Sequence, residues 1–201
     1  MARVYFIMKK ALLLSSALVA AGLLAACATT SRAAYETAPY TVIQKEGAVE
    51  IRDYPALTTV TTSAASDADR DGRFMKLFGY ISGKNGKEEK IEMTTPVFMD
   101  QAAGQARMSF VVPAKVAAAG APAPAKPDIT LVTRPPVRCA VLRFNGLQSA
   151  ASEQQALAKL REWLVAQKIT STGEPVYAYY DSPWTPGLMR RNEVMLTVPK
   201  P

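Results

Sequence analysis

Hydrophobic and polar residues follow two different periods in the first half of the chain. They alternate along 49–60, as in a β-strand with one buried face. Along 68–81 the apolar residues recur every three or four positions instead, which predicts an amphipathic helix. Strand patterns return over 90–98 and 107–112. The first half therefore has the order strand, helix, strand, strand.

The second half repeats this order. A strand pattern over 137–144 precedes a helical pattern over 152–167, and two more strands are predicted over 176–180 and 192–198. We therefore predict an α+β fold. In it, a duplicated strand-helix-strand-strand unit forms a distorted β-barrel or paired sheets, flanked by two helices.

The segments between these elements complete the predicted layout. A single strand precedes each half, over 41–45 and over 129–133. Gly83 and Gly173 are expected to end the two helices, because glycine takes the left-handed conformation of a helix C-terminus most easily. The Ala/Pro-rich connector 114–127 is expected to be exposed and partly extended rather than helical.

The N-terminal segment has the composition of an export signal. Lys9 and Lys10 precede an apolar run over 11–23, which is too short to span a bilayer comfortably. Leu24-Ala25-Ala26-Cys27 follows with the spacing of a lipobox, in which the cysteine thiol receives a diacylglyceryl group. Translation can begin at Met1 or at Met8, and the sequence leaves both starts open.

Three segments follow from this interpretation. We predict a lipoprotein signal over 1–26, a flexible tether over 27–40 that begins at lipidated Cys27, and one domain over 41–201. The expected location is the cell envelope, with the domain held on a membrane by its lipid. Ala28, rather than Asp, follows the cysteine and favours the outer membrane.

Charge and cysteine content exclude several classes of protein. The net charge of +7 includes Arg3, Lys9 and Lys10, which would be lost when an export signal is cleaved. The chain has no dense run of Lys and Arg of the kind that indicates a nucleic-acid partner. Once Cys27 is lipidated, Cys139 is the one remaining thiol, so no intrachain disulfide is expected. Its strand context favours a buried, small hydrophobic role. The oligomeric state stays open.

The chain contains no histidine. This excludes histidine as a general acid, a base or a haem ligand from the chain itself. No spacing of cysteines and histidines suggests a protein-bound metal ion. The composition therefore indicates a binding protein rather than an enzyme.

Four segments, taken in order, resemble the SOUL haem-binding family. They are Val49-Glu50-Ile51-Arg52-Asp53-Tyr54-Pro55, the helix and turn over 74–85, Lys90-Ile91-Glu92-Met93-Thr94-Thr95-Pro96-Val97, and 182–194. The resemblance implies the duplicated fold predicted above. It also implies non-catalytic binding of haem, or of an iron-free porphyrin, in an apolar groove beside the first helix.

This resemblance, together with the helical pattern, suggests candidate ligand-binding residues. Phe74, Met75 and Phe78 would supply apolar contacts, and Arg73 a cation for the propionates of the ligand. Phe74 and Phe78 also fit the alternative of a simple core-facing stripe. Met93 is a candidate axial ligand, although a lone methionine is commonly a filler of the core.

Glu193 supports a different binding hypothesis. Effector-binding domains of similar duplicated architecture hold lipophilic cations over a buried carboxylate, and an inward Glu193 would allow the same here. The domain would then be a receptor or scavenger of lipophilic cations or other small amphiphiles. The alternative is structural, with Glu193 paired to Arg190 or Arg191 and Asn192 closing a turn.

Overall fold

The computed structural model describes residues 34–200. The predicted signal and residues 27–33 of the predicted tether, including Cys27, lie outside these residues. Within 34–200 no helix combines the length and apolar character that a membrane span requires. All three hydrophobic clusters described below lie between Ala38 and Val198, so this region contains a complete core and is expected to fold on its own.

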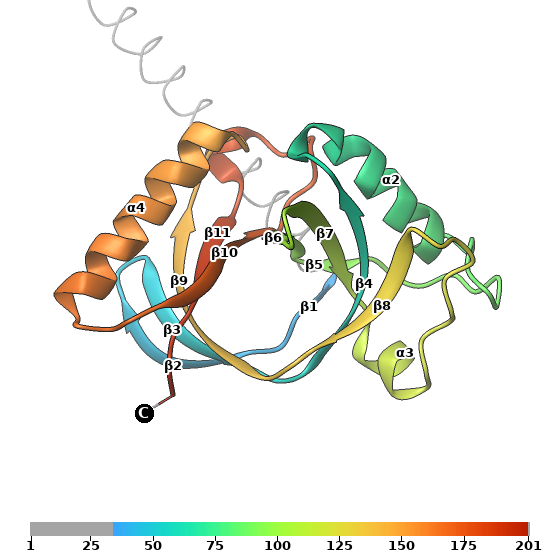
Figure 1. Ribbon diagram of the computed structural model, residues 1–201, viewed down its shortest axis with the longest axis horizontal. Coiled ribbons are helices and arrows are strands. Elements are labelled where there is room, and N and C mark those ends of the chain that lie inside the picture. The colour runs from blue at the N-terminus through green and yellow to red at the C-terminus, as the bar shows by residue number, and fades with distance from the viewer. Residues whose placement is uncertain (1–33, 201) are drawn as a thin grey trace, which may run out of the picture. The chain divides into compact units, whose positions relative to one another are not determined.

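One curved, open sheet of nine strands dominates the part of the chain that the structure describes (Figure 1). The strands are β2 (Thr41–Glu46), β3 (Val49–Tyr54), β4 (Leu57–Ala64), β6 (Val97–Ala102), β7 (Gln105–Val111), β8 (Ile129–Arg134), β9 (Val137–Phe144), β10 (Thr172–Tyr179) and β11 (Asn192–Thr197). Their order is β2-β3-β9-β11-β10-β6-β7-β4-β8, and every neighbouring pair is antiparallel. The α+β prediction is confirmed, with an open sheet rather than a closed barrel.

Two long helices pack on one face of this sheet, on either side of its middle (Figure 1). α2 (Arg70–Ile81) packs against β4 and β7, and α4 (Ala150–Ala166) against β9 and β11. A short helix, α3 (Ala114–Ala118), lies in the Ala/Pro-rich connector, so the expectation of a fully non-helical connector was wrong. Alanine is the strongest helix former, and this segment is mostly alanine.

Alternation along the strands gives the sheet two apolar faces. On β11, Val194 and Leu196 face α4, while Met195 belongs to a cluster on the opposite, concave face with Tyr54 and Phe98. α2 covers a third cluster that includes Leu77, Tyr80 and Phe110. Because side chains of one strand alternate between faces, Glu193 must share the concave face with Met195.

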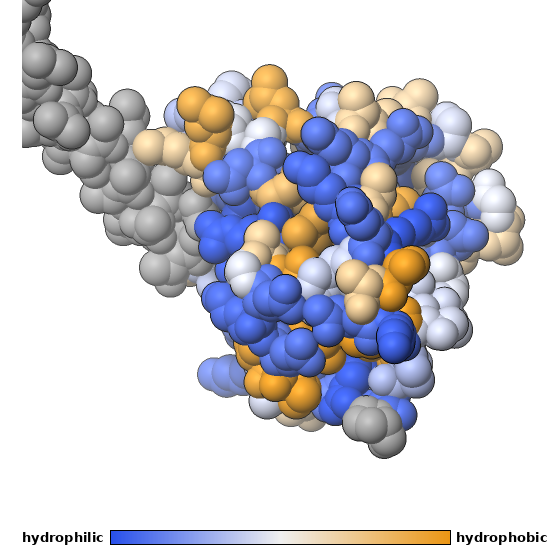
Figure 2. All heavy atoms as spheres, turned by 90° about the vertical axis from the view of Figure 1, so that its left-hand side faces the viewer, coloured by the Kyte–Doolittle hydropathy of each residue, from blue (hydrophilic) through white to orange (hydrophobic). Residues whose placement is uncertain are grey.

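α4 buries one face against the sheet and exposes the other to solvent. Leu160 and Leu164, four positions apart, are buried, whereas the next residue, Val165, is 78% exposed. Figure 2 views the molecule from the α4 side, where hydrophilic side chains cover most of the surface between smaller hydrophobic areas. This face of the domain is an ordinary solvated surface.

The boundaries of two predicted segments change. The strand predicted over 49–60 is two strands, β3 and β4, separated at Pro55, which cannot donate a ladder hydrogen bond. The domain also begins before residue 41, because β1 (Glu36–Thr37) pairs with β5 (Thr94–Thr95) and Ala38 is buried.

The two glycines expected to end the helices have different roles. Gly83, with φ of 104°, follows the end of α2 as predicted. Gly173 does not end α4; it lies inside β10, at an irregularity in the pairing with β11. Lys168 takes the left-handed position after α4, with φ of 57°.

Candidate functional site

The outer flank of α2 carries exposed apolar side chains. Phe74 and Phe78 lie one turn apart, with ring centroids 6.1 Å apart and planes inclined by 13°. Phe74 also meets the edge of Phe110 in the core, at 5.2 Å between centroids. Phe78 is 43% exposed and Met75 is 61% exposed. The core stripe therefore accounts for Phe74, whereas Phe78 and Met75 present apolar surface to solvent.

Arg73 does not lie at the rim of this surface. Its side chain is fully buried, and it donates hydrogen bonds to Asp67 and to the backbone oxygen of Asp69. The expected exposed cation for a propionate was therefore wrong at this position, because residue 73 points into the core side of the helix. Its Nη1 is the one buried side-chain nitrogen or oxygen of the described residues without a hydrogen-bond partner.

Two methionines are candidate thioether ligands for a haem iron. Met75, on α2, is exposed. Met93, which lies outside α2, is half-buried and packs against the same cluster as Phe74. Burial raises the pKa of Tyr177 and of Tyr179, which favours their neutral phenols over phenolate ligands. Burial likewise raises the pKa of Cys139 to about 11, although the charge of Arg134 opposes this shift.

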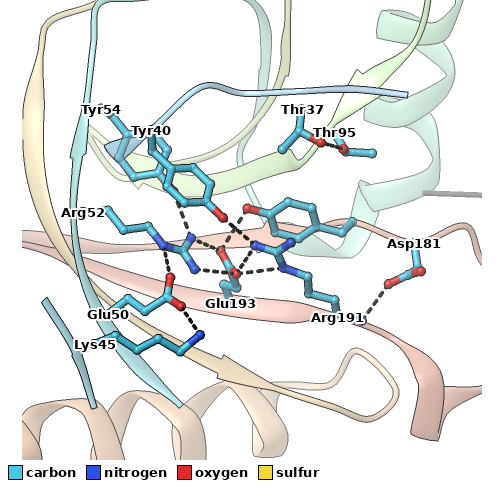
Figure 3. A network of polar contacts seen from close by, with 11 residues as sticks. Thr37, Tyr40, Lys45, Glu50, Arg52, Tyr54, Thr95, Asp181, Arg191 and Glu193 are labelled. Atoms are coloured by element: carbon cyan, nitrogen blue, oxygen red, sulfur yellow. Dashed lines mark hydrogen bonds and ion pairs between the residues drawn. The ribbon is translucent and has the colours of Figure 1, made fainter. Parts of the chain in front are cut away.

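A buried ionic cluster occupies the concave face, and Glu193 is its centre (Figure 3). Arg52 on β3 donates from Nη1 to Oε2 at 2.7 Å and from Nη2 to Oε1 at 3.0 Å. Arg191 donates from Nε at 2.9 Å and from Nη2 at 2.7 Å, both to Oε1. The hydroxyl of Tyr180 donates to Oε2 at 2.9 Å. Five donors thus enclose a carboxylate with no exposed surface.

Aromatic rings and a second acid extend this cluster. The Arg52 guanidinium lies 4.2 Å from the ring centroid of Tyr40, and its Nε donates to Glu50 at 2.7 Å. Arg191 lies 3.9 Å from the ring centroid of Tyr180. Figure 3 shows Arg52 and Arg191 approaching Glu193 from opposite sides. Both cations are therefore held by rings as well as by carboxylates.

The charge balance decides what Glu193 can bind. Burial alone would raise the pKa of this carboxyl, but the hydrogen bonds and charges of Arg52 and Arg191 bring the pKa below its ordinary value. The carboxylate is therefore ionised and already faces two guanidiniums. The cation-binding hypothesis requires an inward Glu193, and Glu193 does point inward. Its pairing follows the structural alternative, which leaves it poorly suited to attract a lipophilic cation.

Sequence reasoning missed Arg52, although a signal was present. The pattern Val49-Glu50-Ile51-Arg52-Asp53-Tyr54 places a cation between acids on a strand whose alternate residues are apolar. Arg52, with only 3% exposure, lies on the same face as Tyr54. A charge at the centre of a core strand requires a buried partner, and only the fold reveals which acid it is.

The segment 90–97 has an architectural role. The Thr94 hydroxyl donates to the backbone oxygen of Val111 at 2.6 Å, and the backbone oxygen of Thr95 accepts from the Ala38 amide at 2.8 Å. The Thr95-Pro96 peptide is cis. These contacts attach the start of the domain to its centre. The family resemblance of this segment is therefore explained by its structural role, without a ligand site.

The sheet and its two helices define a class of duplicated α+β domains that also occurs in other proteins. The C-terminal domain of EcmrR matches with a TM-score of 0.54 at 12% identity, covering 81% of this chain and 99% of that domain. An uncharacterised conserved protein from Listeria innocua matches with a TM-score of 0.58 at 12% identity, covering 75% of this chain and 92% of its own. At these identities the likeness shows the fold alone.

Sequence comparison then gives the family. Residues 35–197 match the SOUL heme-binding protein profile, and the chain belongs to this family. Heme-binding protein 2 of Homo sapiens is 33% identical over 171 residues, covering 79% of this chain and 82% of the relative. Heme-binding protein 2 of Mus musculus is 31% identical over 170 residues, with the same coverage of both chains. The match from residue 35 agrees with the early start of the domain.

Proposed function

We propose that this domain binds haem or another tetrapyrrole, without catalysis, against the outer flank of α2. The observation that carries the proposal is the exposed apolar surface of Met75 and Phe78 beside the half-buried Phe74. Membership of a haem-binding family, and relatives named for haem binding, support the ligand class. Glu193 has no exposed surface and no histidine exists, which argues against acid–base catalysis.

The residues present fit the apolar part of such a ligand. Two nearly parallel phenyl rings offer contact to a flat macrocycle, and Met75 and Met93 offer thioether sulfurs. When bound, haem would supply a redox-active iron, for which a thioether is a weak ligand. Because the side chain of Arg73 is buried and paired to Asp67, apolar contact rather than propionate pairing would dominate the affinity.

A haemin titration tests this proposal. The domain is produced from Ala28 onwards without a histidine tag, since a tag would supply the imidazole that the chain lacks. Haemin should change its Soret absorption saturably at micromolar protein. Phe78→Ala should weaken binding: covering the 43% of Phe78 that is exposed contributes at most about 2 kcal/mol, or roughly 30-fold in affinity.

Val165→Ala on α4 is the matched control, because Val165 is also an exposed apolar residue of a long helix. It should leave haemin affinity unchanged. Equal affinities for the Phe78 and Val165 variants would refute the α2 site, and a titration without saturation would refute tetrapyrrole binding altogether.

We also propose that the protein is an envelope lipoprotein anchored through Cys27, on the basis of Leu24-Ala25-Ala26-Cys27. Stable anchoring needs two acyl chains or more, which lipobox processing would supply. Cys27→Ser should leave an unprocessed precursor, and a conventional cleavable signal in place of 1–27 should release a soluble domain. A re-routed domain that still sediments with membranes after a high-salt wash would contradict the proposal.

A further inference from the structure

A cavity opens on the concave face, on the side of the sheet opposite α2 and α4. Its volume is about 170 Å³, and its walls come from β3, β4, β6, β8, β9, β10 and β11. The wall is mainly apolar and includes Leu57, Phe98, Val137, Val176 and Met195. These residues belong to the concave-face cluster or pack against it, and the exposed Pro55 and Pro135 complete the lining, so the cavity opens from this core to solvent.

The size of this cavity limits its ligand. An apolar cavity of about 150 Å³ in another protein holds one benzene molecule, so about 170 Å³ corresponds to a single ring or a short alkyl chain. A tetrapyrrole contains four such rings and does not fit. The cavity is therefore a separate site from the α2 surface, and a ligand here would not depend on the proposed haem binding.

One charged side chain lines the cavity. Arg134 is 25% exposed, and its guanidinium lies 5.0 Å from the ring centroid of Phe98. Its Nη2 donates to Asp100 Oδ2 at 2.9 Å, while Arg107 Nε donates to Asp100 Oδ1 at 2.7 Å. One carboxylate is thus shared by two guanidiniums, and this trio keeps a net positive charge beside the aromatic wall.

Elsewhere on the concave face, Glu193 is shared by Arg52 and Arg191, and Arg52 also pairs with Glu50. Both of these carboxylates are therefore already paired with guanidiniums. Cys139, in the cavity wall, stays a neutral thiol because burial raises its pKa to about 11. The wall therefore provides no unpaired anion for a cationic ligand, and Arg134 provides a cation for an anionic one.

We infer that the concave cavity binds a small monocyclic aromatic carboxylate, with its ring among Leu57, Phe98 and Met195 and its carboxylate on Arg134. The ring matches the volume and the apolar wall. The carboxylate matches the excess positive charge of the Arg134–Asp100–Arg107 trio.

Phenylacetate is the probe, and ¹⁵N-resolved NMR of the domain from Ala28 onwards is the measurement. Phenylacetate should shift amide signals of β6, β9 and β11 saturably, whereas benzylamine, of similar size and opposite charge, should bind at least tenfold more weakly. Haemin should not compete. Equal or tighter binding of benzylamine, or no saturable shift with either compound, would overturn the inference.

Two variants locate the site. Val176→Phe fills the cavity and should abolish phenylacetate binding without changing haemin affinity. Arg134→Gln should weaken phenylacetate about tenfold and remove the preference over benzylamine, as expected for loss of one charge-assisted hydrogen bond. Arg143→Gln, which removes an exposed charge outside this cavity, is the control and should have no effect. Undiminished phenylacetate binding by a folded Val176→Phe domain would show that the site lies elsewhere.

Discussion

Replacing Glu193 with Gln tests whether the concave ionic cluster holds the two halves of the domain together. The substitution keeps the shape of the side chain and removes its charge. Arg52, at 3% side-chain exposure, and Arg191, at 19%, would then face each other without their shared anion. Removing one partner of a buried ion pair typically costs about 3–5 kcal/mol of unfolding free energy.

The lower end of that range is expected here, because Glu50 still accepts a hydrogen bond from Arg52 at 2.7 Å. A loss of about 3 kcal/mol corresponds to a decrease of roughly 6–12 °C in Tm for a domain of this size. Urea unfolding followed by circular dichroism measures the free energy. Asp53→Asn is the control, because the Asp53–Arg138 pair has similar bidentate geometry at 2.7 and 2.8 Å but is more exposed.

Acid titration gives an independent measurement. The pKa of Glu193 is lowered in the folded state, so the unfolded chain binds a proton first, near its usual pKa of about 4.3. The wild-type domain should therefore lose stability as pH falls below about 4.3, and Glu193→Gln should lose less over the same range. A stability loss below about 1 kcal/mol at neutral pH, or identical acid profiles, would refute the structural role of the cluster.

Three further predictions concern the core, a helix cap and the buried thiol. Leu160→Ala, at a fully buried position of α4, should lower the unfolding free energy by about 2–5 kcal/mol, whereas Val165→Ala on the same helix should change it by less than about 0.5 kcal/mol. Ser149→Ala removes the cap that accepts from the Ser152 amide at 3.2 Å and should cost about 1 kcal/mol; no loss in urea unfolding would contradict this. Cys139, with a pKa raised to about 11 and 4% exposure, should react with Ellman's reagent at pH 8 only upon unfolding, and rapid native-state reaction would contradict its burial.

Local periodicity was sufficient to predict most of the secondary structure. β9 and the helix of each half follow the predicted ranges closely, because their apolar residues repeat with a period that one buried face imposes. The separation of β3 from β4 was missed, since alternation continues across Pro55 and carries no information about which strand each segment pairs with.

The candidate sites were harder to predict because burial depends on tertiary packing. Arg73 and Phe78 are both on α2, yet the cation is buried and the aromatic ring is exposed, the reverse of what hydropathy suggests. One partner of Glu193, Arg52, lies 141 residues away on β3. No local pattern identifies such a pair, although both members lie in segments that resemble the family.

The strand order also determines how the chain can be divided. β3, from the first half, pairs with β9 of the second, and β8, which precedes the second half, pairs with β4 of the first. The connector around α3 is therefore a boundary in sequence and not in structure. If the chain were cut there, each fragment would contain strands whose pairing partners are in the other fragment. The hydrophobic clusters under α2 and α4 would also each lose residues. They should stay largely unfolded when alone and recover native structure only when mixed, so the repeat behaves as one cooperative unit rather than as two modules.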